Sequence, residues 1–173
     1  LKGKKFLEVG CGLGYFSERA ARLEAEVTGI DIGEKLVEKS RQRVPDGKFL
    51  VASASKLPFK KETFDIVLCT EVIEHVDSQR KTLFEIFRVL KKGGVLAITT
   101  PNRIFKPFFG FLSMIGLRPY HGNEKWMLPW ELKGILAKKG NIIVKEEYFN
   151  FFYPIGFLNF FEKTKILKYF MIN

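Results

Sequence analysis

The chain has 173 residues, the length of one globular domain, and 46% of them are hydrophobic, which excludes a disordered chain. Two cysteines are too few for a disulfide framework and indicate a reduced, intracellular protein. The 29 Lys and Arg residues outnumber the 19 Asp and Glu residues, so the net charge is +10. No signal peptide is recognised at the start of the sequence, and we expect a cytoplasmic location.

The positive charge is spread over lysine pairs at positions 4–5, 60–61, 91–92 and 138–139. Such charge is typical of a solvated surface, and it also attracts anionic membranes and nucleic acids. No RNA-binding signature accompanies it. Between the two anionic partners, the sequence therefore favours a membrane surface over nucleic acid.

Short apolar runs and amphipathic segments alternate along the first hundred residues. The apolar runs predict strands at 6–9, 27–30, 48–52, 64–69 and 95–99. The amphipathic segments predict helices at 15–23, 34–43 and 78–90. Apolar strands separated by helices are typical of a Rossmann-like, doubly wound α/β fold, with a mostly parallel sheet covered by helices on both faces. We expect residues 1–173 to form a single domain of this class.

The first predicted strand ends in three alternate glycines, Gly10, Gly12 and Gly14, and passes directly into a helix. Backbone N–H groups at such a turn can hold a nucleotide-sized ligand, although any tight strand–helix corner can also use glycine. A dinucleotide fold needs G-x-G-x-x-G, whose third glycine would fall at Tyr15. The pattern here has instead an acid, Glu8, two residues before the first glycine.

Asp31 follows the second predicted strand, 17 residues after Gly14. Its carboxylate can accept hydrogen bonds from the two hydroxyls of a ribose, or it can cap the following helix. The spacing from the glycine turn favours the ribose interpretation.

The glycine turn with its acid resembles motif I of the class I S-adenosylmethionine (SAM) methyltransferases. Residues 64–76 and 93–103 are similar to segments of the O-methyltransferases of ubiquinone biosynthesis, and the resemblance extends over residues 3–148. It implies SAM as the cofactor and S-adenosylhomocysteine as the product. The cofactor-binding residues that it implies follow the ends of the first four strands: Glu8, Gly10, Cys11, Gly12, Gly14, Asp31, Ile32, Ser53, Ala54, Thr70 and Glu71.

Two of these positions have specific roles in the resembling family. The residue at Ile32 packs on the adenine. Ser53 stands where related enzymes often carry an Asp that accepts from the adenine amino group, and a neutral hydroxyl makes a weaker contact there.

Three polar residues, Glu71, Glu74 and His75, lie within five positions after the fourth strand. If this turn is helical, the three share one face. They can then ligate a divalent cation, as the resembling quinone enzymes suggest, or His75 can act as the catalytic general base. Alternatively, Glu71 and His75 only hydrogen-bond the loop and shape the pocket.

Two aromatic stretches follow the fifth strand: a lid insertion at about 103–128 and a C-terminal tail at about 149–173. The apolar run of the first, 104–117, is too short to span a bilayer. The two stretches predict either a buried lid that completes the core or an apolar acceptor site and membrane dock. Tyr120, His121 and Trp126 are expected to face the acceptor. A sixth strand is expected at 141–147, but 159–173 shows no clean final strand.

These observations predict transfer of the SAM methyl group to a small-molecule or lipid-like acceptor, at oxygen, with His75 as the base. The alternatives are a SAM-dependent methyltransferase of RNA or protein, and a non-catalytic SAM-binding module. We expect a cytoplasmic protein with peripheral membrane contact. The oligomeric state and the use of a metal are not predicted.

Overall fold

The computed structural model describes residues 1–116, 124–137, 142–149 and 166–172. Its strands are β1 (Lys5–Val9), β2 (Glu26–Asp31), β3 (Lys48–Val51), β4 (Phe64–Thr70), β5 (Leu90–Thr100), β6 (Ile142–Phe149) and β7 (Ile166–Ile172). Its helices are α1 (Tyr15–Arg22), α2 (Glu34–Arg43), α3 (Gln79–Val89), α4 (Lys106–Met114) and α5 (Pro129–Ala137), with a 3₁₀ turn η1 (Arg103–Phe105) before α4.

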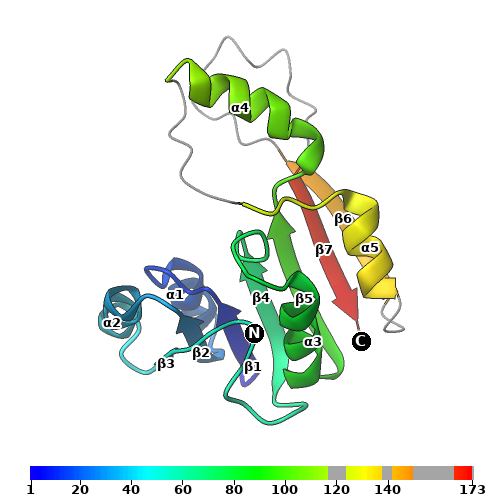
Figure 1. Cartoon of the computed structure of the whole chain (residues 1–173). Coiled ribbons are helices and arrows are strands. Elements are labelled where there is room, and N and C mark those ends of the chain that lie inside the picture. The colour runs from blue at the N-terminus through cyan, green and yellow to red at the C-terminus, as the bar shows by residue number, and fades with distance from the viewer. Residues whose placement is uncertain (117–123, 138–141, 150–165, 173) are drawn as a thin grey trace.

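The strands form one seven-stranded sheet in the order β3-β2-β1-β4-β5-β7-β6 (Figure 1). β1 to β5 pair in parallel, and β7 is antiparallel to both β5 and β6. The chain builds outward from β1 to β3 and then returns to place β4 on the other side of β1. The strand order therefore reverses between β1 and β4, which is where open α/β sheets bind their ligands.

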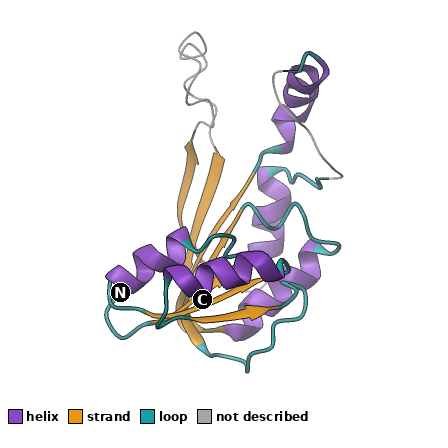
Figure 2. Ribbon diagram, turned by 90° about the vertical axis from the view of Figure 1, so that its left-hand side faces the viewer, coloured by secondary structure: helices purple, strands orange, loops and turns teal. Residues whose placement is uncertain are grey.

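Helices cover the two faces of the sheet, as the sequence predicts. Phe6 of β1 packs with residues of α1 and α2 on one face, and Leu7 and Val9 pack with residues of α3 and α5 on the other. Figure 2 shows α1 and α2 in front of the sheet and the remaining helices beyond it. Leu7 and Val9 are completely buried, so the two-sided burial that makes a strand continuously apolar is present in β1.

β5 begins five residues earlier than the sequence predicts, directly after α3. Phe64 pairs with Leu90, but Ile66 pairs with Val95, so residues 91–94 bulge out of the ladder. Lys91 Nζ lies 2.9 Å from Asp65 Oδ1 and ties this bulge to β4. The lysines and glycines at 91–94 read as a helix stop, although here they form an irregular start of the strand.

The expectation of no final strand is wrong. β7 lies between β5 and β6, antiparallel to both. Its sequence, Ile-Leu-Lys-Tyr-Phe-Met-Ile, is almost continuously apolar and does not alternate. A strand inside a sheet needs no alternation, so this run could not be told apart from the apolar tail that precedes it.

The lid insertion forms η1 and α4, and α4 stands away from the sheet (Figure 1). None of the α4 residues is buried. Phe111 is 53% exposed and Met114 is 77% exposed. Helix α4 therefore adds no buried residue to the core, whereas Trp126 and Met127 near the end of the insertion are buried, and Met127 belongs to the core cluster of the sheet. Within the described residues, no helix is both long enough and apolar enough to cross a bilayer.

Candidate active site

A cavity of about 490 Å³ lies at the carboxyl ends of β1, β2, β3 and β4. It includes the point where the strand order reverses. Eight of the residues predicted from the sequence lie in its wall: Gly10, Asp31, Ile32, Ser53, Ala54, Thr70, Glu71 and His75. Four others are not part of the wall: Glu8, Cys11, Gly12 and Gly14.

The glycine turn after β1 needs its glycines for two different reasons. Gly10, Gly12 and Gly14 all have φ between 51° and 77°, a region that other residues rarely adopt. A Cβ at Gly10 would overlap the side chain of Val72, and one at Gly14 would come within 2.9 Å of Ser40 Oγ. A Cβ at Gly12 would meet nothing within 4 Å, so the turn is open to a ligand at that point.

The carboxylate of Asp31 is fixed by two backbone donors. Gly12 N donates to Oδ2 and Gly33 N donates to Oδ1, each at 2.9 Å. The N-cap of α2 is Gly33, which has no side-chain capping bond. Asp31 therefore joins the end of β2 to the glycine turn of β1 and does not cap the helix. Each of its carboxylate oxygens keeps a further lone pair for a ligand hydroxyl.

The side chain of Glu8 contacts α1 and does not line the cavity. Its side chain is only 1% exposed, and Ser17 Oγ of α1 donates to Glu8 Oε2 at 2.5 Å. Burial raises the pKa of Glu8 to about 7, and the bond from Ser17 partly opposes this increase. Because side chains alternate along a strand, Glu8 shares the α1–α2 face with Phe6. We expected Glu8 and Asp31 to share a cavity, and this does not hold.

Cys11 is buried next to α2, with its Sγ 3.6 Å from Ser40 Oγ. Burial raises the pKa of the Cys11 thiol to about 11, so it stays protonated and is a poor nucleophile. Its backbone, not its side chain, belongs to the turn: Cys11 N donates to Ile30 O at 2.8 Å.

The polar turn after β4 is not helical. Glu71 has a positive φ of 54°, and residues 71–78 form bends and turns, so the three polar side chains do not follow helical spacing. Thr99 Oγ1 donates to Glu71 Oε1 at 2.8 Å, and Thr100 Oγ1 donates to Glu74 Oε2 at 3.2 Å. The two threonines at the end of β5 were not singled out from the sequence, although parallel neighbouring strands bring their ends together.

The two carboxyl groups of this turn differ in position. Glu71 reaches the cavity wall, whereas Glu74 is only 2% exposed. Burial raises the pKa of both, and the charge of Glu71 raises that of Glu74 further. The charge of Glu124, a residue not singled out from the sequence, also raises the pKa of both groups.

The side chain of His75 is 56% exposed, in contrast to the buried Glu74 beside it. Its Nε2 lies 3.9 Å from Glu74 Oε1, and its ring lines the cavity. In the described part of the chain, no three His, Cys, Asp or Glu side chains are grouped so that they could hold a metal ion.

Of the three residues expected to face the acceptor, Trp126 is the one that the structure describes, and it does not line this cavity. Trp126 is 3% exposed, donates from Nε1 to Glu124 Oε2 at 2.5 Å and packs edge-to-face on Phe109. Tyr120 and His121 lie outside the described residues.

Comparison with known proteins places this site in a family. Residues 7–98, more than half of the chain, match the family described as "Methyltransferase domain". The chain belongs to this methyltransferase family. The methyltransferase domain is 35% identical over 156 residues to a protein from Pelagibacter ubique named "Ubiquinone biosynthesis O-methyltransferase", covering 84% of this chain and 64% of that protein.

Other relatives agree with this assignment. A "Probable S-adenosylmethionine-dependent methyltransferase" of Mycolicibacterium smegmatis is 39% identical over 123 residues, covering 70% of this chain and 46% of that protein. The chain therefore spans less than two thirds of the length of these two relatives. A SAM-dependent methyltransferase structure from Mesorhizobium loti shares the fold, with a TM-score of 0.78 at 16% identity, covering 99% of this chain and 92% of that one.

The cofactor of this methyltransferase domain is SAM, and the cavity fits it. The wall offers a fixed carboxylate at Asp31, and the glycine turn has open space at Gly12. Ile32, 79% exposed, adds an apolar surface of the kind that an adenine ring can cover. These are three chemical features that suit an adenosyl group: acceptors for the ribose hydroxyls, an unobstructed backbone and an apolar contact.

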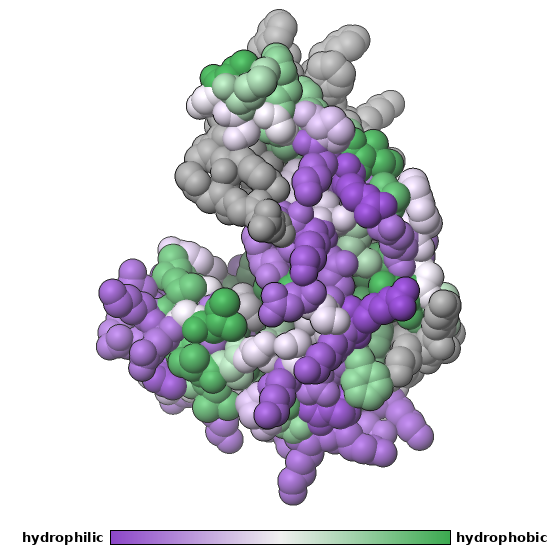
Figure 3. Space-filling model, viewed as in Figure 1, coloured by the Kyte–Doolittle hydropathy of each residue, from purple (hydrophilic) through white to green (hydrophobic). Residues whose placement is uncertain are grey.

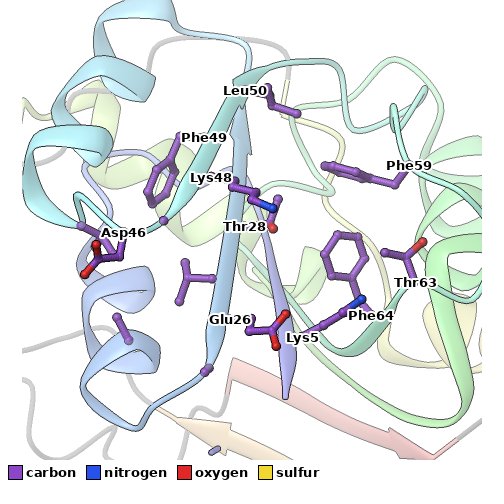
Figure 4. A pocket seen from close by; sticks show the side chains of 15 residues that line it. Lys5, Glu26, Thr28, Asp46, Lys48, Phe49, Leu50, Phe59, Thr63 and Phe64 are labelled. Atoms are coloured by element: carbon purple, nitrogen blue, oxygen red, sulfur yellow. The ribbon is translucent and has the colours of Figure 1, made fainter. Parts of the chain in front are cut away.

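A larger hollow of about 790 Å³ lies at the opposite, amino-terminal ends of the strands. Its wall includes Lys5, Glu26, Lys48 and Phe64, the first residues of the first four strands, together with Phe59 (Figure 4). A loop at residues 52–63, instead of a helix, connects β3 to β4 next to it. Parallel sheets bind ligands at their carboxyl ends, so the smaller cavity is the candidate active site of the methyltransferase domain.

Proposed function

We propose that this domain transfers the methyl group of SAM to a small-molecule or lipid-like acceptor, at an oxygen atom. The observation that carries the proposal is that one cavity brings together Asp31 on one side and Glu71 with His75 on the other. A cofactor bound in this cavity would therefore lie next to a side chain that can accept a proton. The names of the relatives, which include ubiquinone biosynthesis O-methyltransferases, support an oxygen acceptor.

Bound SAM supplies a methyl group that is already activated, so the protein has to hold the cofactor and align the acceptor. We assign the ribose hydroxyls to Asp31, the adenine face to Ile32 and the adenine amino group to Ser53. Ser53 Oγ already lies 3.0 Å from Ser55 Oγ, so it is held in place before a ligand arrives. Alignment of two reactants in one site can contribute about 7–11 kcal/mol to catalysis.

His75 is the general base in this proposal. An acceptor hydroxyl must lose its proton as its oxygen bonds to the methyl carbon, and the imidazole of His75 takes that proton. Glu74 Oε1 lies 3.9 Å from Nε2, but burial raises the pKa of Glu74 to about 8, so this carboxyl group keeps its own proton near neutral pH and leaves the transferred proton to His75.

We also infer that α4 contacts a lipid surface, at the cytoplasmic side of a membrane. Figure 3 shows hydrophobic residues gathered on this helix. Phe108, Phe111 and Met114 are between 39% and 77% exposed, and the net charge of +10 favours an anionic surface. An apolar acceptor dissolved in that surface would then be close to the domain that modifies it.

The deciding experiment is transfer of a labelled methyl group from SAM to a panel of phenols and isoprenoid phenols. RNA and basic or acidic proteins belong in the same panel because the +10 charge favours the alternative of a macromolecular acceptor. Label in a phenol extract supports the proposal. Label in RNA or protein contradicts it, and SAM binding by calorimetry without any transfer indicates a non-catalytic module.

A further inference from the structure

A cleft of about 580 Å³ lies on the outer side of the polar turn and shares no residue with the cofactor cavity. The starts of α3, α4 and α5 border it, together with η1 and the segment 124–127. Six charged side chains line it: the cations Arg80, Arg103, Lys106 and Lys125 and the carboxylates Glu124 and Glu131.

The four cations of this cleft outnumber its two carboxylates, and only Arg103 forms an ion pair with a residue that the structure describes. Arg103 Nη2 pairs with Glu131 Oε1 at 2.8 Å. Lys106 Nζ and Lys125 Nζ donate instead to backbone carbonyls, those of Glu124 at 3.0 Å and Asp77 at 2.8 Å. Within the described residues, neither lysine forms an ion pair.

Arg80 adds a further positive charge, whereas the carboxylate of Glu124 opposes it. Arg80 also forms no ion pair with any residue that the structure describes. The Glu124 carboxylate accepts from Trp126 Nε1, and its charge acts on the carboxyl groups of the polar turn. Arg80 lies in the first turn of α3 and Trp130 in that of α5, where exposed N–H groups add partial positive charge.

An apolar surface adjoins this cationic cleft. Lys106, which lines the cleft, is also the first residue of α4, and Phe108 and Phe111 follow it on the exposed helix. Trp130, in the wall of the cleft, is 60% exposed. Tryptophan and lysine next to exposed aromatic side chains are the combination found where proteins meet the headgroup region of a bilayer.

We propose that this cleft binds the phosphate group of an anionic lipid, whose apolar chains lie against α4. The phosphate carries the charge that complements Arg80, Lys106 and Lys125, and the chains cover the aromatic side chains that follow Lys106. The inference rests on the lipid contact of the proposed function but not on methyl transfer. The cleft would be the site at which the lipid headgroup binds when α4 contacts the membrane.

Intrinsic fluorescence tests the proposal directly, because both tryptophans of the chain, Trp126 and Trp130, line this cleft. The protein is titrated with phosphatidylcholine vesicles, with and without phosphatidylglycerol. We expect a blue shift of the emission with the anionic vesicles only. In a Trp130→Phe variant we expect most of this shift to be lost, which assigns it to the exposed ring.

The double variant Arg80→Gln with Lys106→Gln removes two charges and keeps N–H donors at both positions. We expect about thirtyfold weaker binding to the anionic vesicles, taking about fivefold for each basic residue near such a surface. The matched control, Lys35→Gln with Lys39→Gln, removes two exposed charges from α2 and should bind almost as the parent does. Equal weakening in both variants would overturn the cleft as the binding site.

Glycerol phosphate distinguishes a lipid from a soluble phosphate compound. An emission change with glycerol phosphate and none with vesicles would assign the cleft to a soluble ligand and overturn the lipid proposal. No change with either probe would overturn the phosphate site itself. SAM binding, measured by calorimetry in every variant, should stay unchanged, so failure here is separate from failure of the methyltransferase proposal.

Discussion

Gly12 N donates a hydrogen bond to Asp31 Oδ2 at 2.9 Å, across 19 residues of sequence. The bond connects the turn after β1 to the end of β2, so the ends of these two neighbouring strands are joined beside the cofactor cavity. It also orients the carboxylate that we assign to the ribose.

Replacing Asp31 by Ala should weaken SAM binding by about ten- to a hundredfold, because hydrogen bonds to a charged group contribute about 1.5–3 kcal/mol. Calorimetry with SAM and S-adenosylhomocysteine measures this change. Asp46→Ala is the control, since Asp46 is exposed and lies outside the cavity wall. Unchanged SAM affinity in the Asp31 variant would remove the ribose assignment.

Two glycines of the turn should respond differently to alanine. In Gly12→Ala the new methyl group has open space around it. Only the strain of a positive φ should therefore lower the free energy of unfolding, by about 1–2 kcal/mol. Gly10→Ala should cost about 1–3 kcal/mol more, because its Cβ would overlap Val72. Denaturant unfolding measures both.

A double variant checks the cause of the larger effect. Shortening Val72 to Ala beside Gly10→Ala makes room for the new methyl group, so the two changes should be less destabilising together than their sum. Additive costs would show that the overlap with Val72 is not the reason.

Removing the imidazole of His75 should lower the rate of methyl transfer by about 10²–10⁴, the usual contribution of a general base. The folding of the His75→Ala variant and its SAM affinity should change little, because the side chain is 56% exposed. Added imidazole should restore part of the activity. If the His75→Ala variant is fully active without added imidazole, His75 only shapes the cavity.

Glu8 should make the stability of the domain depend on pH. Its pKa in the folded protein, about 7, lies above the ordinary value of 4.5, so folding favours the protonated form. The free energy of unfolding should therefore fall as the pH rises from about 4.5 to about 7, by about 3 kcal/mol for this group.

The variant Glu8→Gln tests this dependence, because glutamine can still accept from Ser17 but does not ionise. Unfolding experiments at pH 5 and pH 8 should show a smaller loss of stability in the variant than in the parent. Some slope should remain, since burial also raises the pKa of Glu71 and Glu74. Glu34→Gln, at an exposed position, should keep the full slope.

The features that depend on local sequence could be predicted. Strand, glycine turn and helix follow one another at Gly10, and the acid after β2 lies at the expected distance, so the sequence pattern indicated this sheet edge and the family resemblance added the remaining cofactor-binding residues. The parallel order then brings Asp31 and Glu71 to the same edge, as strand topology requires.

Other features depend on contacts between distant segments. Glu8 meets Ser17 on the far face of β1, which strand alternation permits but the motif does not reveal. The polar turn is not helical because Glu71 adopts a positive φ and is held by Thr99 from the next strand. The cationic cleft is lined by both Arg80 and Trp130, which are 50 residues apart and which no sequence pattern connects.

The position of β7 has a consequence for synthesis of the chain. β7 follows β5 and β6 in sequence but lies between them, and it provides the only described ladder that links β6 to the rest of the sheet. A ribosome-bound chain that has not yet released residues 166–172 can assemble β1 to β5, while β6 has no strand to pair with. Folding at this end of the sheet therefore waits for a segment that is translated after the other strands that the structure describes.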